Sequence, residues 1–174
     1  MISNALRETY ITHLMMAKEL SAILSVELKD SLNFNNVEVF PDIKKINTLA
    51  MDTDRLLTTS YFCEQGRGLF VVSEELCHYM SQKFLGMSTE SSKQSSPILI
   101  EYFATIIFNK LRDLYEKHSF QMNLDRRVQK LREIQFNEAI EAYNVFRMKL
   151  CDKSSEKGAL MTLLPVGLVK EEAE

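Results

Sequence analysis

The chain has 174 residues, 45% of them apolar, which is enough for one domain with a sizeable core. Its formal net charge is −3, and charged residues are spread along the sequence, so no acidic or basic arm points to nucleic acid or to a membrane surface. No apolar run reaches the roughly 20 residues of a membrane-spanning helix. We therefore expect a protein that binds no nucleic acid and does not insert into a membrane.

The first two helices are predicted from spacing and from capping residues. Apolar side chains at steps of three and four predict an amphipathic helix from Asn4 to about Leu28. Its core stripe is predicted to be Leu6, Tyr10, Leu14, Ala17, Ser21, Leu24 and Leu28. A second helix is predicted to begin at Ser73, whose hydroxyl can accept a free backbone N–H, and to end near Gly86.

A polar stretch and a long helix follow. Residues 87–96 are too polar to bury and predict a surface loop. Ser96 is the predicted cap of a third helix, and Pro97 takes its first position, where its missing N–H costs nothing. This helix runs to about Lys117 and is apolar over most of its circumference, which predicts burial on more than one side.

Two stretches are predicted to form hairpins. The first covers residues 56–73 and turns at 64–67. The second covers residues 139–166, is interrupted at Asn144 and turns at 152–158. In its first strand one face is predicted to carry Ile140, Ala142, Phe146, Met148 and Leu150.

The order of elements indicates an internal duplication. Helix, connector and hairpin occur twice, and Gly68 and Gly158, which open the second strands of the two hairpins, are 158 − 68 = 90 residues apart. We expect a single module over residues 1–169, made of half one at about 4–72, a connecting helix at 73–86 and half two at about 96–165. Residues 170–174 form an acidic tail.

Several segments, in this order, resemble the middle domain of the flagellar switch protein FliM across nearly the whole chain. They are Val37-Glu38-Val39-Phe40, Gly68-Leu69-Phe70-Val71-Val72, Phe84-Leu85-Gly86, Ile100-Glu101 and Gly158-Ala159-Leu160-Met161 with Pro165. The resemblance implies the α/β, CheC-like fold of the CheC–CheX–FliM superfamily. In that fold, two pseudo-twofold halves, each a helix plus an antiparallel hairpin, form a sheet covered by long helices.

The resemblance also implies a non-catalytic scaffold or adaptor of a flagellar switch or chemotaxis-related assembly. FliM middle domains pack side by side and bind FliG through a glycine-rich loop after the second helix. The expected partner-binding residues in this chain are Gly86, Met87, Ser88, Thr89 and Glu101. The expected partners are FliG-like, FliN-like or FliM-like proteins and a response regulator, with self-association, at the cytoplasmic face of a flagellar or secretion basal body.

A catalytic alternative comes from the same superfamily. CheC and CheX phosphatases use Glu-x-x-Asn on a helix, where the amide orients a water molecule toward the phosphoaspartate. Here Glu101 is followed three residues later by Ala104, and Glu8 is followed by Ile11. The sequence therefore predicts no enzyme. A divergent phosphatase with a displaced site, and a type III secretion sorting-platform component or chaperone, are the alternatives.

Other chemistry is weighed against ordinary structural roles. The cysteines Cys63, Cys77 and Cys151 lack Cys-x-x-Cys spacing, which favours a reducing cytoplasm over a disulfide framework or a zinc site. Cys77 is expected to be a small core residue, and no cofactor or metal is predicted. The basic cluster, namely Arg126, Arg127, Lys130 and Arg132, is read as a solvated face. The start at Met1 and the acidic tail favour a natural stand-alone protein.

Overall fold

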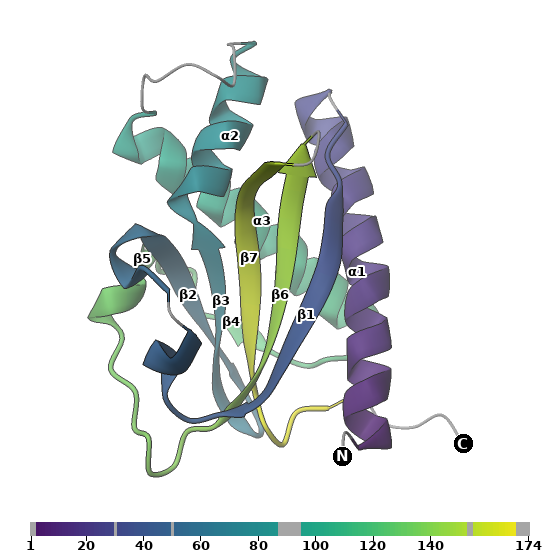
Figure 1. Ribbon diagram of the computed structural model, residues 1–174, viewed down its shortest axis with the longest axis vertical. Coiled ribbons are helices and arrows are strands. Elements are labelled where there is room, and N and C mark those ends of the chain that lie inside the picture. The colour runs from purple at the N-terminus through teal and green to yellow at the C-terminus, as the bar shows by residue number, and fades with distance from the viewer. Residues whose placement is uncertain (1–2, 30, 50, 87–94, 153–154, 170–174) are drawn as a thin grey trace.

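In a computed structural model, three helices pack against an antiparallel sheet of seven strands (Figure 1). The structure describes residues 3–29, 31–49, 51–86, 95–152 and 155–169, and the element counts refer to these. The helices are α1 (Asn4–Leu28), α2 (Glu74–Phe84) and α3 (Pro97–Lys117). The strands are β1 (Phe34–Ile43), β2 (Leu56–Cys63), β3 (Gly66–Ser73), β4 (Asn123–Leu124), β5 (Gln129–Lys130), β6 (Tyr143–Asp152) and β7 (Ser155–Pro165). Short 3-10 turns are η1 (Ile46–Leu49), η2 (Thr53–Arg55) and η3 (Leu131–Glu133).

Serine caps fix the start of each helix. The backbone N–H of Leu6 donates to the Ser3 hydroxyl at 3.1 Å, and the Ser73 and Ser96 hydroxyls cap α2 and α3 in the same way. The predicted limits of α1 and α3 are confirmed. The second helix ends at Phe84, because Gly86 adopts a left-handed φ of 68° that an α-helix cannot continue through.

The strand order of the sheet is β1-β6-β7-β3-β2-β4, with β5 also pairing with β2. The equivalent strands of the two halves are β1 with β4 and β5, β2 with β6, and β3 with β7. If each strand is replaced by its equivalent, the order read from one edge becomes the order read from the other edge. The first hairpin turns at Glu64 and Gln65, within the predicted turn at 64–67, and β3 begins at Gly66, two residues before the predicted Gly68. The strand order thus agrees with the predicted α/β fold of two pseudo-twofold halves.

The second hairpin differs from the prediction at its start. It begins at Tyr143, and Ile140, predicted to lie on the buried strand face, is 80% exposed. The reason is a tight turn in which the backbone N–H groups of Ile140 and Glu141 both donate to the Asn137 carbonyl. Asn144 does not interrupt the strand, because its side-chain carbonyl accepts from the Asp42 N–H at 3.1 Å.

The turn of the second hairpin is also shorter than predicted. β7 already begins at Ser155, and Gly158 lies within the strand, opposite Leu150. Gly158 has a φ of 137°, and a Cβ there would approach the backbone of Leu76 to 2.7 Å. The glycine is needed where α2 passes over β7, rather than for the turn itself.

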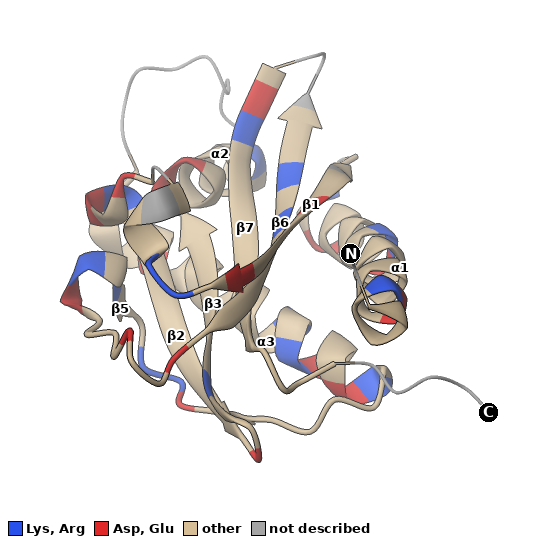
Figure 2. Cartoon of the chain, turned by 60° about the horizontal axis from the view of Figure 1, so that its bottom comes forward, with Lys and Arg blue, Asp and Glu red and all other residues tan. Residues whose placement is uncertain are grey.

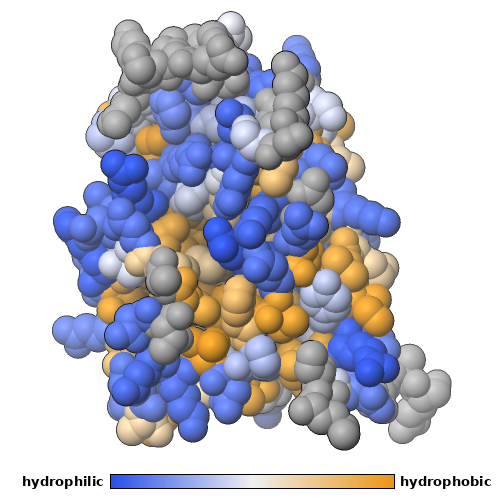
Figure 3. Space-filling view, viewed as in Figure 1, coloured by the Kyte–Doolittle hydropathy of each residue, from blue (hydrophilic) through white to orange (hydrophobic). Residues whose placement is uncertain are grey.

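Two apolar layers lie on the two faces of the sheet. α1, α2 and α3 cover one face, where Phe70, Phe146 and Leu160 are among the fully packed residues. The opposite face, here called the open face, carries Val71 and Met161, and within the described part of the chain the connecting segments around η1 and η3 cover it. Apolar side chains remain visible between hydrophilic ones on that face (Figure 3).

One side chain of α1 departs from the predicted core. Leu14 is 38% exposed, and its neighbour Met15 is 51% exposed, whereas Met16 is fully buried. The helix packs mainly against β1, so its buried stripe is narrower than apolar spacing alone predicts.

Lys, Arg, Asp and Glu lie mixed along the helices and strand ends, and neither sign forms one large field (Figure 2). Among the described residues, no helix is long and apolar enough to cross a membrane.

Candidate functional site

An exposed apolar surface lies where the end of α2 meets the start of α3. We call it the junction patch and define it by Phe84, Leu85, Ile98 and Tyr102. These side chains are 55%, 51%, 82% and 53% exposed. The rings of Phe84 and Tyr102 both meet the buried ring of Phe103 edge-on, at centroid distances of 5.7 and 5.3 Å. One buried aromatic therefore supports the patch from both helices.

The junction patch has the character of a protein-contact surface. Single exposed apolar residues are ordinary, but neighbouring large ones with two aromatic rings mark an interaction site. Ile98 and Tyr102 are four residues apart on α3 and form one ridge. The aromatic contacts hold Tyr102 and Phe84 in place before a partner binds, which lowers the entropy cost of association.

The residues expected from the sequence are partly brought together here. Gly86 follows Leu85 directly and is exposed, with open space around its Cα. Glu101 is exposed beside Tyr102. Met87, Ser88 and Thr89 lie outside the described residues.

Sequence reasoning missed the four members of the junction patch as a site. The signal for two of them was present, since the apolar stripe of α3 was wider than one buried helix face. It was read as burial on more than one side, but Ile98 is exposed while Phe103 and Ile107 are buried. The excess apolar surface thus faces solvent at the N-terminal end of α3.

A polar network ties α2 to Ser95, which precedes the N-cap of α3. The backbone N–H of Ser95 donates to His78 Nδ1 at 3.1 Å, and the Ser95 hydroxyl lies 2.8 Å from the same nitrogen. The Ser81 hydroxyl also contacts the Ser95 hydroxyl. Since Nδ1 accepts from a backbone N–H, His78 carries its proton on Nε2. This network fixes the spacing between α2 and the start of α3.

Cys77 takes no part in that network. The side chain is fully buried, and burial raises the pKa of its thiol to about 12. A thiol held protonated in the core is not a nucleophile, so the prediction of a small core residue is confirmed.

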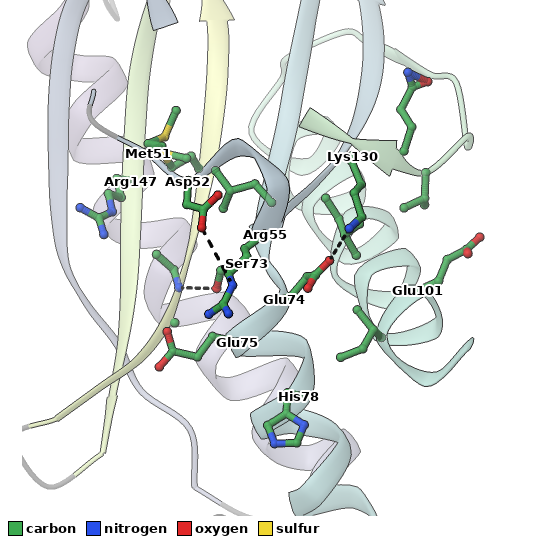
Figure 4. A pocket seen from close by; sticks show the side chains of 18 of the residues that line it. Met51, Asp52, Arg55, Ser73, Glu74, Glu75, His78, Glu101, Lys130 and Arg147 are labelled. Atoms are coloured by element: carbon green, nitrogen blue, oxygen red, sulfur yellow. Dashed lines mark hydrogen bonds and ion pairs between the residues drawn. The ribbon is translucent and has the colours of Figure 1, made fainter. Parts of the chain in front are cut away.

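A groove of about 1430 Å³ opens on the open face of the sheet (Figure 4). Its apolar lining includes Phe40, Met51 and Met161, from β1, the connector and β7. Its wall includes the start of α2 and the first turns of α3, where Glu101 lies. The groove is wide enough for a segment of another protein.

The charges around the groove largely neutralise one another. Lys130 lies 3.6 Å from Glu74, and Arg147 lies 3.2 Å from Glu156. These half-exposed pairs contribute little to stability, but they leave no strong field of either sign. Glu101 forms no ion pair within the described part of the chain and stays available to a partner.

The positions that would carry the Glu-x-x-Asn phosphatase motif differ in exposure between α3 and α1. Glu101 is exposed, but Ala104 is fully buried against the sheet. On α1, both Glu8 and Ile11 face solvent, and Ile11 offers no hydrogen bond. Asn109 is half-buried two turns beyond Glu101. Neither helix carries an asparagine three residues after its exposed glutamate, as the Glu-x-x-Asn motif requires.

Members of the basic cluster and His118 form ion pairs or hydrogen bonds with carboxylates. In the basic cluster, Lys130 is paired as above, and Arg132 lies 3.3 Å from Asp54. The Nε2–H of His118 donates to a carboxylate oxygen of Glu19 at 2.6 Å. Within the described residues, no group of three or more His, Cys, Asp or Glu side chains is arranged to hold a metal ion.

No protein-family model and no curated protein matches the sequence. Solved structures do match. The FliM middle domain from H. pylori superposes with a TM-score of 0.71 at 16% identity, covering 95% of this chain and 94% of that chain. FliY from Thermotoga maritima gives 0.67 at 12% identity, covering 97% and 94%. CheX from Vibrio vulnificus gives 0.54 at 12% identity, covering 86% and 95%. The chain therefore has the fold shared by FliM middle domains, FliY and CheX, as the sequence predicted.

Proposed function

We propose that the chain is a non-catalytic scaffold or adaptor module that binds protein partners in a flagellar-switch or chemotaxis-related assembly. The junction patch is the observation that carries this proposal. It joins Phe84 and Leu85 of the α2 end to Ile98 and Tyr102 of α3, next to Gly86 and Glu101. A partner covering it would bury two aromatic rings, the kind of side chain that dominates binding energy at protein interfaces.

A FliG-like protein is the proposed occupant of the junction patch. Among solved structures of this fold are FliM in complex with FliG and FliM in complex with SpeE, both from H. pylori. The patch supplies the apolar centre of such an interface, and Glu101 supplies a charged rim. A rim charge mainly orients the partner during approach, while the buried centre holds it.

Self-association would use a different surface. Ile11, Leu14 and Met15 lie on the exposed side of α1, at helical spacing, and are 42%, 38% and 51% exposed. This α1 stripe supports the proposal that copies of the chain, or a FliM-like protein, pack side by side.

The non-catalytic part of the proposal is supported by Ala104 and Ile11. An amide must stand beside the glutamate and reach solvent to orient a water molecule. Ala104 lies in the core, so even an asparagine at that position would need a shift of α3 to reach a phosphoaspartate. Ile11 faces solvent but offers only hydrocarbon.

The alternative is a divergent phosphatase of the chemotaxis response regulator. It is kept because Glu101 is exposed and because CheX of this fold occurs in a complex with CheY from Borrelia burgdorferi. It predicts that the chain accelerates loss of the aspartyl phosphate and that Glu101→Gln abolishes this effect. Glu116→Gln, an exposed glutamate at the other end of α3, is the matched control. No acceleration by the wild type would remove this alternative.

The proposed function is tested by co-purification and size-exclusion chromatography with FliG-like, FliN-like and FliM-like proteins at micromolar concentrations. Binding of one of them supports the proposal. A type III secretion sorting platform would use the same surfaces and is distinguished by which partner is captured. If none of the three binds, the proposal fails.

A further inference from the structure

A small cavity lies between α3 and the sheet edge where β4 and β5 pair with β2. Its volume is about 250 Å³. Thr59 of β2 and Phe108 of α3 are its most buried lining residues, and Arg126, between β4 and β5, is exposed at its edge. The cavity is smaller than the sites that hold drug-sized ligands.

The cavity contains a buried hydroxyl without a partner. Thr59 is 1% exposed, and its Oγ1 makes no hydrogen bond. The hydroxyl of Thr58, one residue earlier on the opposite face, donates to the Phe70 carbonyl at 2.7 Å. Buried hydroxyls are normally satisfied, and an unsatisfied one lowers stability. A valine at position 59 would have the same shape without this loss.

At the edge of the same cavity, Arg126 has an unfavourable backbone conformation. Arg126 has a φ of 62°, in the left-handed region that non-glycine residues rarely adopt. Within the described residues its guanidinium forms no ion pair, whereas Lys130 and Arg132 of the basic cluster are paired with carboxylates. The half-buried amide of Asn109 also makes no hydrogen bond there. Three unused donor groups therefore line one cavity.

We propose that this cavity binds a small organic anion, namely a short-chain monocarboxylate. The Arg126 guanidinium, the Asn109 amide and the Thr59 hydroxyl can each donate to a carboxylate oxygen. Among the described residues, no acidic side chain lines the cavity to repel a negative charge. Phe108, Leu124 and Val128 provide apolar walls for a hydrocarbon portion. The cavity shares no residue with the junction patch, and this proposal does not depend on the proposed function.

Thermal unfolding of the intact chain, at constant ionic strength, tests the site with sodium butyrate and inorganic phosphate as probes. Butyrate is expected to give a saturable rise in Tm, because a ligand that binds only the folded state stabilises it. Arg126→Gln should weaken the butyrate affinity about tenfold or more, as expected for a lost charge-assisted hydrogen bond. Arg127→Gln, which removes a neighbouring charge that does not line the cavity, should leave the affinity unchanged.

Thr59→Val distinguishes an effect on butyrate binding from an effect on the stability of the fold. It should raise the Tm of the ligand-free chain while reducing the response to butyrate, a combination that a purely structural threonine would not give. The proposal is overturned by the absence of a saturable butyrate response in the wild type. Equal losses in Arg126→Gln and Arg127→Gln, or a response to phosphate alone, also overturn it.

Discussion

Val71 of β3 lies directly opposite Met161 of β7 in the antiparallel register, and the two residues are 161 − 71 = 90 positions apart. This is the offset that relates the two halves of the sequence, so each residue is the other's counterpart. The pseudo-twofold axis of the fold therefore passes between them. The same offset carries Phe70 onto Leu160, and both face the helices. Residues directly opposite each other in an antiparallel pair point to the same face of the sheet, so the preceding residues, Phe70 and Leu160, share the other face.

Met161→Ala is expected to destabilise the fold by about 2–4 kcal/mol, because it leaves a cavity on the open face at the axis. Met161 is only 4% exposed and packs in the same cluster as Val71. The free energy of unfolding in urea measures the loss. Val166→Ala, at the 41% exposed residue just after β7, is the control and should stay within about 0.5 kcal/mol of the wild type. Equal effects of the two substitutions would contradict the packing described here.

The stability of the chain is expected to fall as the pH drops from about 6.5 toward 4. Burial lowers the pKa of His13 from 6.5 to about 4, while its Nδ1–H donates to the Thr9 carbonyl at 2.7 Å. The unfolded chain takes up a proton at the ordinary pKa and the folded chain does not, so low pH favours unfolding. The expected loss by pH 4 is about 3 kcal/mol, measured by urea unfolding at a series of pH values.

His13→Gln is the control for this pH dependence. The variant removes the titrating ring but keeps polar atoms near Thr9 and Tyr115, so the slope between pH 6.5 and 5 should become much smaller. A hydrogen bond from Lys117 is the chief cause that lowers the pKa of Glu19. Glu19 therefore makes both proteins less stable as the pH falls below about 4.5, outside the range compared here. An unchanged slope in the variant would show that His13 is not responsible.

Gly158→Ala is expected to cost more stability than Gly66→Ala, although both glycines have a similar left-handed φ, of 137° and 128°. A Cβ at Gly66 would meet nothing within 4 Å, so only backbone strain of about 1–3 kcal/mol is expected there. At Gly158 it would also press on the Leu76 backbone and separate α2 from β7. Thermal unfolding of the two variants compares them, and equal losses would mean that the close approach does not matter.

Local signals were enough to predict most of the fold. Ser73, Ser96 and Pro97 have one favoured place at a helix start, and the structure puts them there. The 90-residue offset predicted the halves because it records a repeated order of elements rather than a single motif. Two-residue strands such as β4 and β5 carry no periodicity, so their pairing with β2 could not be read from the sequence.

The candidate site was less accessible to sequence reasoning. Ile98 and Tyr102 have the same apolar character as the buried Ile107, and spacing alone does not say which side of a helix meets the sheet. For the same reason, spacing predicts Leu14 of α1 to lie in the core, although it is exposed. Gly86 and Glu101 came from the family resemblance, and Glu101 was found exposed beside the patch that gives the site its apolar surface.

The central claim, that the junction patch binds a partner, is tested most directly by isothermal titration of the chain with the FliG-like protein. Ile98→Asp should abolish the binding, because it places a charge at the most exposed apolar side chain of the patch. Ile140→Asp is a matched control, since Ile98 is 82% and Ile140 80% exposed on different parts of the molecule. Both variants should keep the unfolding temperature of the wild type. Loss of binding in Ile98→Asp alone is the predicted result, and equal binding by the wild type and Ile98→Asp would contradict the claim.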